Sequence, residues 1–141
     1  QYGSTSPKEG TTAGCDWVEA NISKFLGQEG VKADKLVLGV PFYTRLWKES
    51  NGNITSYTVN VKDVNEVIPS NASKTWDENL KQYYVEYKEN GTTYKMWVED
   101  EKSIEEKLNL IEKYNLAGAA YWEKDRETNS ILDLISNKLG I

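Results

Sequence analysis

Tyr43, Arg45 and Trp47 are the side chains best placed to contact a ligand, because they follow a short apolar run at a spacing of two. Tyr and Trp offer a flat apolar face with a polar tip, which suits stacking on sugar rings and suits ordinary half-buried positions equally well. The run itself, Leu36–Val40, contains β-branched residues and is typical of a strand buried on both faces. Pro41 cannot donate to a sheet ladder, so we expect regular pairing to fail at or just after it.

The carboxyl end of such a strand is where α/β folds with parallel strands bind their ligands. On this interpretation Tyr43, Arg45 and Trp47 form a binding rim. The alternative is that Tyr43 and Trp47 are core aromatics and that Arg45 is a solvated charge. The residues alone leave both interpretations open.

The composition excludes several kinds of chemistry. The 141 residues contain no His, which removes Ser-His-Asp and Cys-His catalysis and nearly all zinc sites, and we expect neither a metal nor a cofactor. The net charge of −5, without a basic run, argues against binding to nucleic acid or to an anionic membrane. No apolar run approaches the roughly 20 residues that span a bilayer. The lone Cys15 excludes an internal disulfide.

The length suits one domain. The chain begins without an initiating Met, in a stretch over Gln1–Gly14 that is typical of a loop. We therefore expect a fragment of a longer protein. A helix should follow, with Asp16 as its cap, Glu19 as the capping-box partner and Gly27 at its end. Its apolar face comprises Val18, Ile22, Phe25 and Leu26. Helix, short loop and buried strand together indicate a unit of a parallel α/β fold.

The middle of the chain predicts antiparallel structure. A polar turn at Asn51-Gly52 leads to a strand over Ile54–Val61, a short helix over Val61–Ile68 and a loop over Ser70–Lys74.

The dipeptide Asn90-Gly91 predicts a hairpin and fixes its register. One face then pairs Tyr87 with Tyr94, Val85 with Met96 and Tyr83 with Val98. The other face pairs Lys88 with Thr93, Glu86 with Lys95 and Tyr84 with Trp97. A slip by one residue would break all of these matches. The Tyr84/Trp97 face is the freer one, and it either covers the sheet or offers a ligand platform.

The parallel pattern resumes after Asp100. Ser103 and Glu106 predict a capping box for a helix whose apolar positions are Ile104, Leu108, Ile111 and Leu116. A second short buried strand over Leu116–Trp122 follows, and then a charged loop. A last helix capped by Asn129 has Ile131, Leu134, Ile135 and Leu139 on its apolar face. If both buried strands share one parallel sheet, Trp122 emerges on the same rim as Tyr43, Arg45 and Trp47.

Two motifs carry a resemblance to a known family. Gly39-Val-Pro-Phe-Tyr-Thr-Arg-Leu-Trp47 and Gly118-Ala-Ala-Tyr-Trp-Glu123 resemble the seventh and eighth barrel strands of glycoside hydrolase family 18. Trp97-Val-Glu-Asp100 resembles the sequence before that family's seventh helix, and Gln1-Tyr-Gly3 resembles the loop after its sixth strand. The resemblance runs over essentially the whole chain. It is closest to the bacterial branch that acts on cell walls and spore cortex.

The resemblance implies an α/β fold, namely the C-terminal portion of a (β/α)8 TIM barrel with its last two strands and their helices. Residues 1–47 would form a barrel segment that ends in the seventh strand. Residues 48–100 would form a small antiparallel α+β insertion domain. Residues 101–141 would form a second barrel segment with the eighth strand. Such a fragment leaves strand edges open, through which it can self-associate.

The resemblance also implies a parent enzyme that cleaves β-linked N-acetylglucosamine polymers, of the chitin or peptidoglycan type, by substrate-assisted retaining hydrolysis. Trp122 would floor the sugar subsite, Tyr43 and Arg45 would hydrogen-bond the sugar, and Trp47 and Trp97 would supply outer stacking surfaces. The family's Asp-x-x-Asp-x-Asp-x-Glu motif, whose Glu is the general acid, does not occur here, so we expect no catalytic residue in this chain and no activity from the chain alone. The alternative is a non-catalytic carbohydrate-binding chitinase-like protein. A secreted or cell-envelope location, in a bacterium, follows from the same resemblance.

Overall fold

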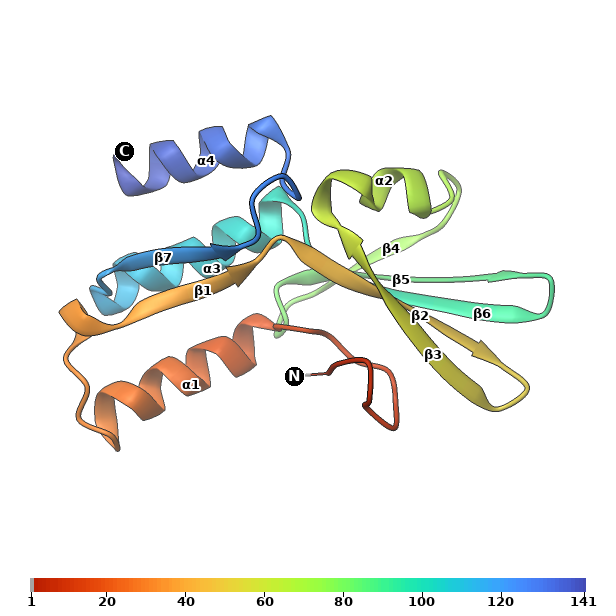
Figure 1. The fold of residues 1–141 in the computed structure, drawn as a ribbon, viewed down its shortest axis with the longest axis horizontal. Helices are drawn as coiled ribbons and strands as arrows, with labels where there is room; N and C mark the ends of the chain where they lie inside the picture. The colour runs from red at the N-terminus through yellow and green to blue at the C-terminus, as the bar shows by residue number, and fades with distance from the viewer. Residues whose placement is uncertain (1) are drawn as a thin grey trace.

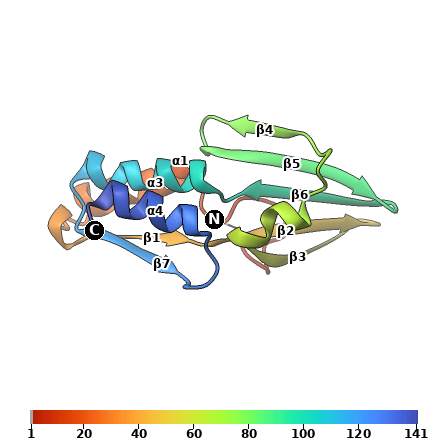
Figure 2. The same ribbon diagram turned by 90° about the horizontal axis from the view of Figure 1, so that it is seen from above.

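Strands β1 (Val37–Pro41) and β7 (Gly118–Trp122) form a two-stranded parallel sheet in the computed structural model, which describes residues 2–141. Helices α1 (Cys15–Gly27), α3 (Glu101–Tyr114) and α4 (Asn129–Leu139) lie along one face of this sheet (Figures 1 and 2). The predicted pair of parallel strands, each preceded by a helix, is confirmed. Gln1, the first residue of the predicted N-terminal loop, lies outside the described residues.

The helices cover only one face of the parallel sheet, and the burial of β1 alternates accordingly. Leu38 and Val40 are 8% and 2% exposed and belong to the core, whereas Val37 is 51% exposed. In β7, Ala120 is exposed on the uncovered side. The prediction of strands buried on both faces is therefore wrong for this structure, because nothing in residues 2–141 covers the second face.

A five-stranded antiparallel sheet follows β1 almost without interruption, since Phe42 alone separates β1 from β2. The strand order is β3-β2-β6-β5-β4. The strands, in chain order, are β2 (Tyr43–Ser50), β3 (Asn53–Asn60), β4 (Lys74–Asp77), β5 (Gln82–Glu89) and β6 (Thr92–Val98). A short helical segment, η2 (Val61–Asp63) continuing into α2 (Val64–Val67), packs Val64 and Ile68 on this sheet, as predicted.

Both predicted Asn-Gly turns are confirmed. Asn51 and Gly52 have φ of 51° and 76°, and Asn90 and Gly91 have φ of 50° and 77°, the left-handed pair that a two-residue hairpin turn requires. The predicted register of β5 and β6 holds at every pair. Tyr87 and Tyr94 stack with ring centroids 4.9 Å apart and pack against the core of this sheet, which includes Val85 and Met96.

Several local predictions differ from the structure. Strand β4 was not predicted, because four residues on a sheet edge leave little pattern. Helix α1 begins after Gly14 without a side-chain cap. Asp100 forms the capping box of α3 with Ser103, and Thr128 caps α4, so these two helix starts lie earlier than predicted. Another short 3-10 turn, η1 (Ala33–Lys35), precedes β1. None of the helices in residues 2–141 is long and apolar enough to cross a membrane.

Candidate functional site

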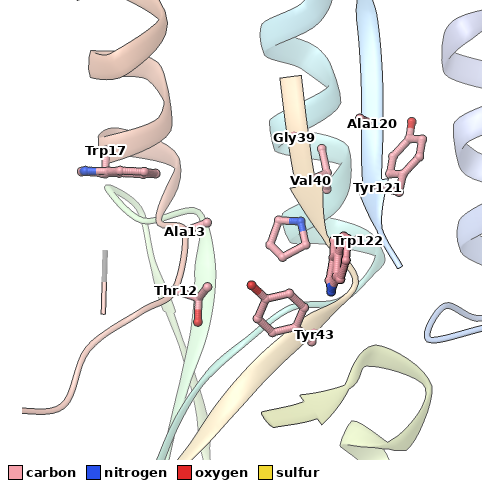
Figure 3. Close-up of a pocket in the computed structure, with 10 residues that line it drawn as sticks. Thr12, Ala13, Trp17, Gly39, Val40, Tyr43, Ala120, Tyr121 and Trp122 are labelled. Carbon is pink, nitrogen blue, oxygen red and sulfur yellow. The ribbon is translucent and has the colours of Figure 1, made fainter. Parts of the chain in front are cut away.

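A cleft of about 360 Å³ opens at the carboxyl ends of β1 and β7. Three parts of the chain contribute to its walls: the N-terminal loop with the start of α1, the β1–β2 junction, and the end of β7 (Figure 3). The residues that line the cleft include Thr12, Trp17, Pro41, Tyr43, Tyr121 and Trp122. The position is the one expected for a ligand site on parallel strands.

Trp122 presents the largest open apolar surface of the cleft. It is the last residue of β7, pairs with Pro41 across the parallel sheet, and is 64% exposed. The Phe42 amide donates to the Trp122 carbonyl at 2.7 Å, which holds the end of β7 against the β1–β2 junction. The Trp122–Glu123 peptide bond is cis. The indole and the Tyr43 ring lie beside each other at the cleft (Figure 3).

Tyr43 is the first residue of β2 and brings the only phenol that enters the cleft from the antiparallel sheet within the described residues. Its ring is half-buried, and its hydroxyl is directed toward the N-terminal loop near Thr12 (Figure 3). Of the five predicted substrate-binding residues, Tyr43 and Trp122 therefore lie together in one cleft.

The other predicted contacts lie outside the cleft. The Arg45 guanidinium donates from Nη1 to Ser56 Oγ at 2.9 Å on the neighbouring strand β3. Trp97 is half-buried and packs against Tyr84 with ring centroids 5.0 Å apart, so it mainly covers the sheet. Residues two apart in a strand share a face, so Tyr43 and Arg45 point to the same side of β2.

Trp47 corrects one predicted role. It is 2% exposed, and its Nε1 donates to the Gly10 carbonyl at 2.9 Å. The N-terminal loop thus lies over the ring and leaves no open face on which a sugar could stack. Trp47 is a core aromatic that anchors this loop, which is the alternative that the sequence had left open.

Sequence reasoning missed the wall formed by Thr12 and Trp17. Trp17 lies in the first turn of α1, off the predicted apolar face, and is 42% exposed. A large aromatic residue outside the buried stripe of a helix was the one available signal. Nothing in the sequence indicated that the preceding loop folds back to the carboxyl ends of β1 and β7.

Glu123, the carboxylate that follows Trp122, and Glu99, which does not line the cleft, are both engaged in ion pairs. Arg126 donates from Nε and Nη2 to Glu123 Oε1 at 3.0 and 2.7 Å. Glu99 is fully buried and accepts from Lys107 Nζ at 2.7 Å. Desolvation raises the pKa of Tyr121, whose ring stacks on Phe42 at 4.9 Å, so this phenol stays neutral. No group of three His, Cys, Asp or Glu in residues 2–141 could hold a metal ion.

Comparisons with known proteins identify the family of the chain. Residues 3–127 match the family described as glycosyl hydrolases family 18. The chain is 31% identical over 121 residues to class V chitinase CHIT5 of Lotus japonicus, a match that covers 75% of this chain and 30% of that protein. It is 29% identical over 101 residues to the cortical fragment-lytic enzyme of Bacillus subtilis, covering 64% and 22% respectively.

Among solved structures, a chitinase from Chromobacterium violaceum superimposes with a TM-score of 0.82 and 22% identity. The superposition covers 99% of this chain and 44% of that one, so the fold is of the TIM-barrel-related α/β type. The chain spans about a third or less of the length of the curated relatives it matches. The chain belongs to glycosyl hydrolases family 18.

Proposed function

We propose that this chain is the sugar-binding part of a glycoside hydrolase that cleaves β-linked N-acetylglucosamine polymers, of the chitin or peptidoglycan type. Family membership supports a glycosidase. The names of two relatives, a chitinase and a cortical fragment-lytic enzyme, support polymers of this class. Such substrates lie in cell walls, and we place the site of action outside the cell or in its envelope.

The exposed indole of Trp122 is the observation that carries this proposal. A tryptophan that is 64% exposed at the floor of a cleft is a costly feature unless a ligand covers it. The apolar face of a pyranose ring is flat and matches an indole in size. Tyr43 beside it supplies a hydroxyl that can hydrogen-bond the sugar, while Arg45 acts at the outer edge of the same strand.

On this proposal residues 1–47 and 101–141 belong to two adjacent units of a (β/α)8 barrel, and residues 48–100 are an insertion between them. Strand β2 (Tyr43–Ser50) runs from the barrel segment into the insertion and joins the two. On this proposal the remaining walls of the cleft, including the general acid, come from outside these residues.

The reaction on this proposal is a substrate-assisted retaining hydrolysis, in which the N-acetyl carbonyl attacks the anomeric carbon while a protonated carboxyl supports the leaving oxygen. The residues described here bind and orient the sugar. Trp122 holds the N-acetylated ring, and Tyr43 fixes its rotation. Glu123 does not serve as the acid because Arg126 holds it in an ion pair, and Glu99 does not because it is buried outside the cleft.

The ion pair that holds Glu123, the carboxylate next to Trp122, also fits a second candidate, a carbohydrate-binding chitinase-like protein without catalysis. The two candidates differ in one measurement. An intact protein that binds and hydrolyses chito-oligosaccharides is an enzyme, and one that binds them without turnover is a lectin-like relative.

Calorimetric titration of the intact protein with tri-N-acetylchitotriose tests the proposal. Trp122→Ala should weaken binding at least about thirtyfold, since loss of a central tryptophan typically costs about 2 kcal/mol or more. Tyr57→Ala is the matched control, because Tyr57 is 47% exposed on β3 and lies outside the cleft. Equal affinities of the wild type and Trp122→Ala would rule out Trp122 as the sugar platform.

A further inference from the structure

The indole of Trp122 needs support from outside β7, because the strand ends at this residue and most of the side chain is exposed. The loop that follows runs to Thr128, the cap of α4. Within that loop the Arg126 amide donates to the Glu123 carbonyl at 3.3 Å, which closes a turn directly after Trp122. This turn is the first structure after Trp122, so its position bears on where Trp122 presents its ring.

Arg126 joins the turn to the antiparallel sheet. Its Nε and Nη2 donate to Glu123 Oε1, and its Nη1 donates to Asn60 Oδ1 at 3.2 Å. The Arg126 carbonyl accepts from the Lys62 amide at 3.0 Å. One side chain thus holds the residue after Trp122 on one side and the last residue of β3 on the other. A guanidinium is planar and presents its donors in a fixed fork, so the two partners are held in one relative orientation.

Asn60 connects Arg126 to Tyr43, which lines the cleft. It is the partner of Tyr43 in the β2–β3 register, and its Nδ2 donates to Asp63 Oδ2 at 2.9 Å. Trp122 is in turn the partner of Pro41 in the parallel sheet. Trp122 and Tyr43 are therefore linked twice, once through the β1–β2 backbone and once through Arg126 and Asn60.

We propose that Arg126 is a positioning residue that sets the orientation of the Trp122 indole relative to Tyr43 without itself touching the ligand. Arg126 does not line the cleft, and its donors are directed to Glu123 and Asn60. The inference rests on the proposed function for its effect on sugar binding. Its effect on the indole itself is independent of any sugar.

The position of the indole can be measured directly by ¹⁹F NMR on protein labelled with 5-fluorotryptophan. Comparison with Trp122→Phe assigns the Trp122 resonance. Arg126→Ala should shift or broaden that resonance, and Asn60→Ala should do the same, because each breaks the same link. Lys138→Ala is the matched control: it also removes a cation from a partly exposed ion pair, with Glu105, and lies away from the cleft. It should leave the Trp122 resonance unchanged.

Affinity for tri-N-acetylchitotriose gives the second readout. Arg126→Ala should weaken binding by roughly three- to tenfold, because the loosened indole must then be immobilised when the sugar binds. The double variant Arg126→Ala/Asn60→Ala should bind about as well as Arg126→Ala alone, since the link is already broken. Arg126→Lys should recover part of the affinity, because one ammonium keeps the charge but cannot span both partners.

An unchanged Trp122 resonance in Arg126→Ala would overturn the proposal, and so would a lower melting temperature without any change at Trp122. Additive losses of affinity in the double variant would also overturn it. If the wild type binds no chito-oligosaccharide, the proposed function fails, whereas the fluorine spectra still decide whether Arg126 positions Trp122.

Discussion

Replacing Lys107 by Met should destabilise the protein strongly, because Lys107 forms a buried ion pair with Glu99. The two side chains are 0% and 1% exposed, with Nζ and Oε1 2.7 Å apart. Glu99 also accepts hydrogen bonds from Gln82 Nε2 and Ser103 Oγ, each at 2.7 Å. A Met side chain fills most of the space of the Lys stem, so the main loss is the positive charge. The carboxylate would remain buried with neutral donors only.

The size of the effect follows from the burial. Removing one partner of a buried ion pair typically lowers the free energy of unfolding by about 3–5 kcal/mol. Domains of this kind are stable by only about 5–15 kcal/mol, so this is a large share of the total. For a chain of this length the melting temperature should fall by roughly 10–20 °C.

The loss of unfolding free energy in Lys107→Met should depend on pH. Burial raises the pKa of the Glu99 carboxyl, because desolvation outweighs the attraction of Lys107. A folded state with a raised carboxyl pKa binds more protons than the unfolded state, so its stability falls as the pH rises from the unfolded pKa through the folded one. Without Lys107 the rise in this pKa is larger. The Lys107→Met protein should therefore be least impaired at low pH, near the ordinary pKa of a carboxyl group, and increasingly impaired as the pH rises above it.

Urea denaturation followed by circular dichroism at several pH values measures both quantities. The double variant Glu99→Gln/Lys107→Met, which carries no buried charge, should recover most of the stability. Lys138→Met is the matched control at a partly exposed ion pair and should cost no more than about 1 kcal/mol. A loss below about 1 kcal/mol in Lys107→Met, or the same loss at every pH, would refute the reasoning.

Two further predictions concern a helix start and the activity of the chain. Asp100→Ala removes the capping box of α3 and should lower the free energy of unfolding by about 1 kcal/mol; urea curves identical to the wild type would contradict this. The purified 141-residue chain should not hydrolyse chito-oligosaccharides, because the general-acid motif does not occur in it and Glu123, next to Trp122, is held in an ion pair. Release of reducing sugar by the pure chain would contradict this.

The register of the β5–β6 hairpin could be predicted in full, because residues close together in the sequence determine it. Asn90-Gly91 determines the turn, and alternation then assigns every side chain from Tyr83 to Val98 to a face. The parallel pair β1 and β7 was recognisable from two apolar runs. Their one-sided burial was not, since it depends on which helices cover the sheet.

The candidate site was predictable where strands position it. Tyr43 and Trp122 follow the ends of predicted strands, and the structure places both in one cleft. Trp47 was misjudged because its burial depends on the Gly10 carbonyl in a distant loop. The contribution of Trp17 was missed because this residue lies off the predicted apolar face of α1, and its role depends on how the start of that helix meets the ends of β1 and β7.

The continuity of β1 and β2 limits how this protein can be re-engineered by exchange of parts. Tyr43 begins the antiparallel sheet and also lines the cleft, so no junction separates the two without passing through a shared strand. A graft that begins after Trp47 would divide β2 and interrupt its ladders with β3 and β6. The exchangeable unit is instead Tyr43–Val98, and any donor sequence for that unit brings its own residue at position 43 into the cleft. Altering the sheet of this protein is therefore inseparable from altering the side chain that position 43 presents in the cleft.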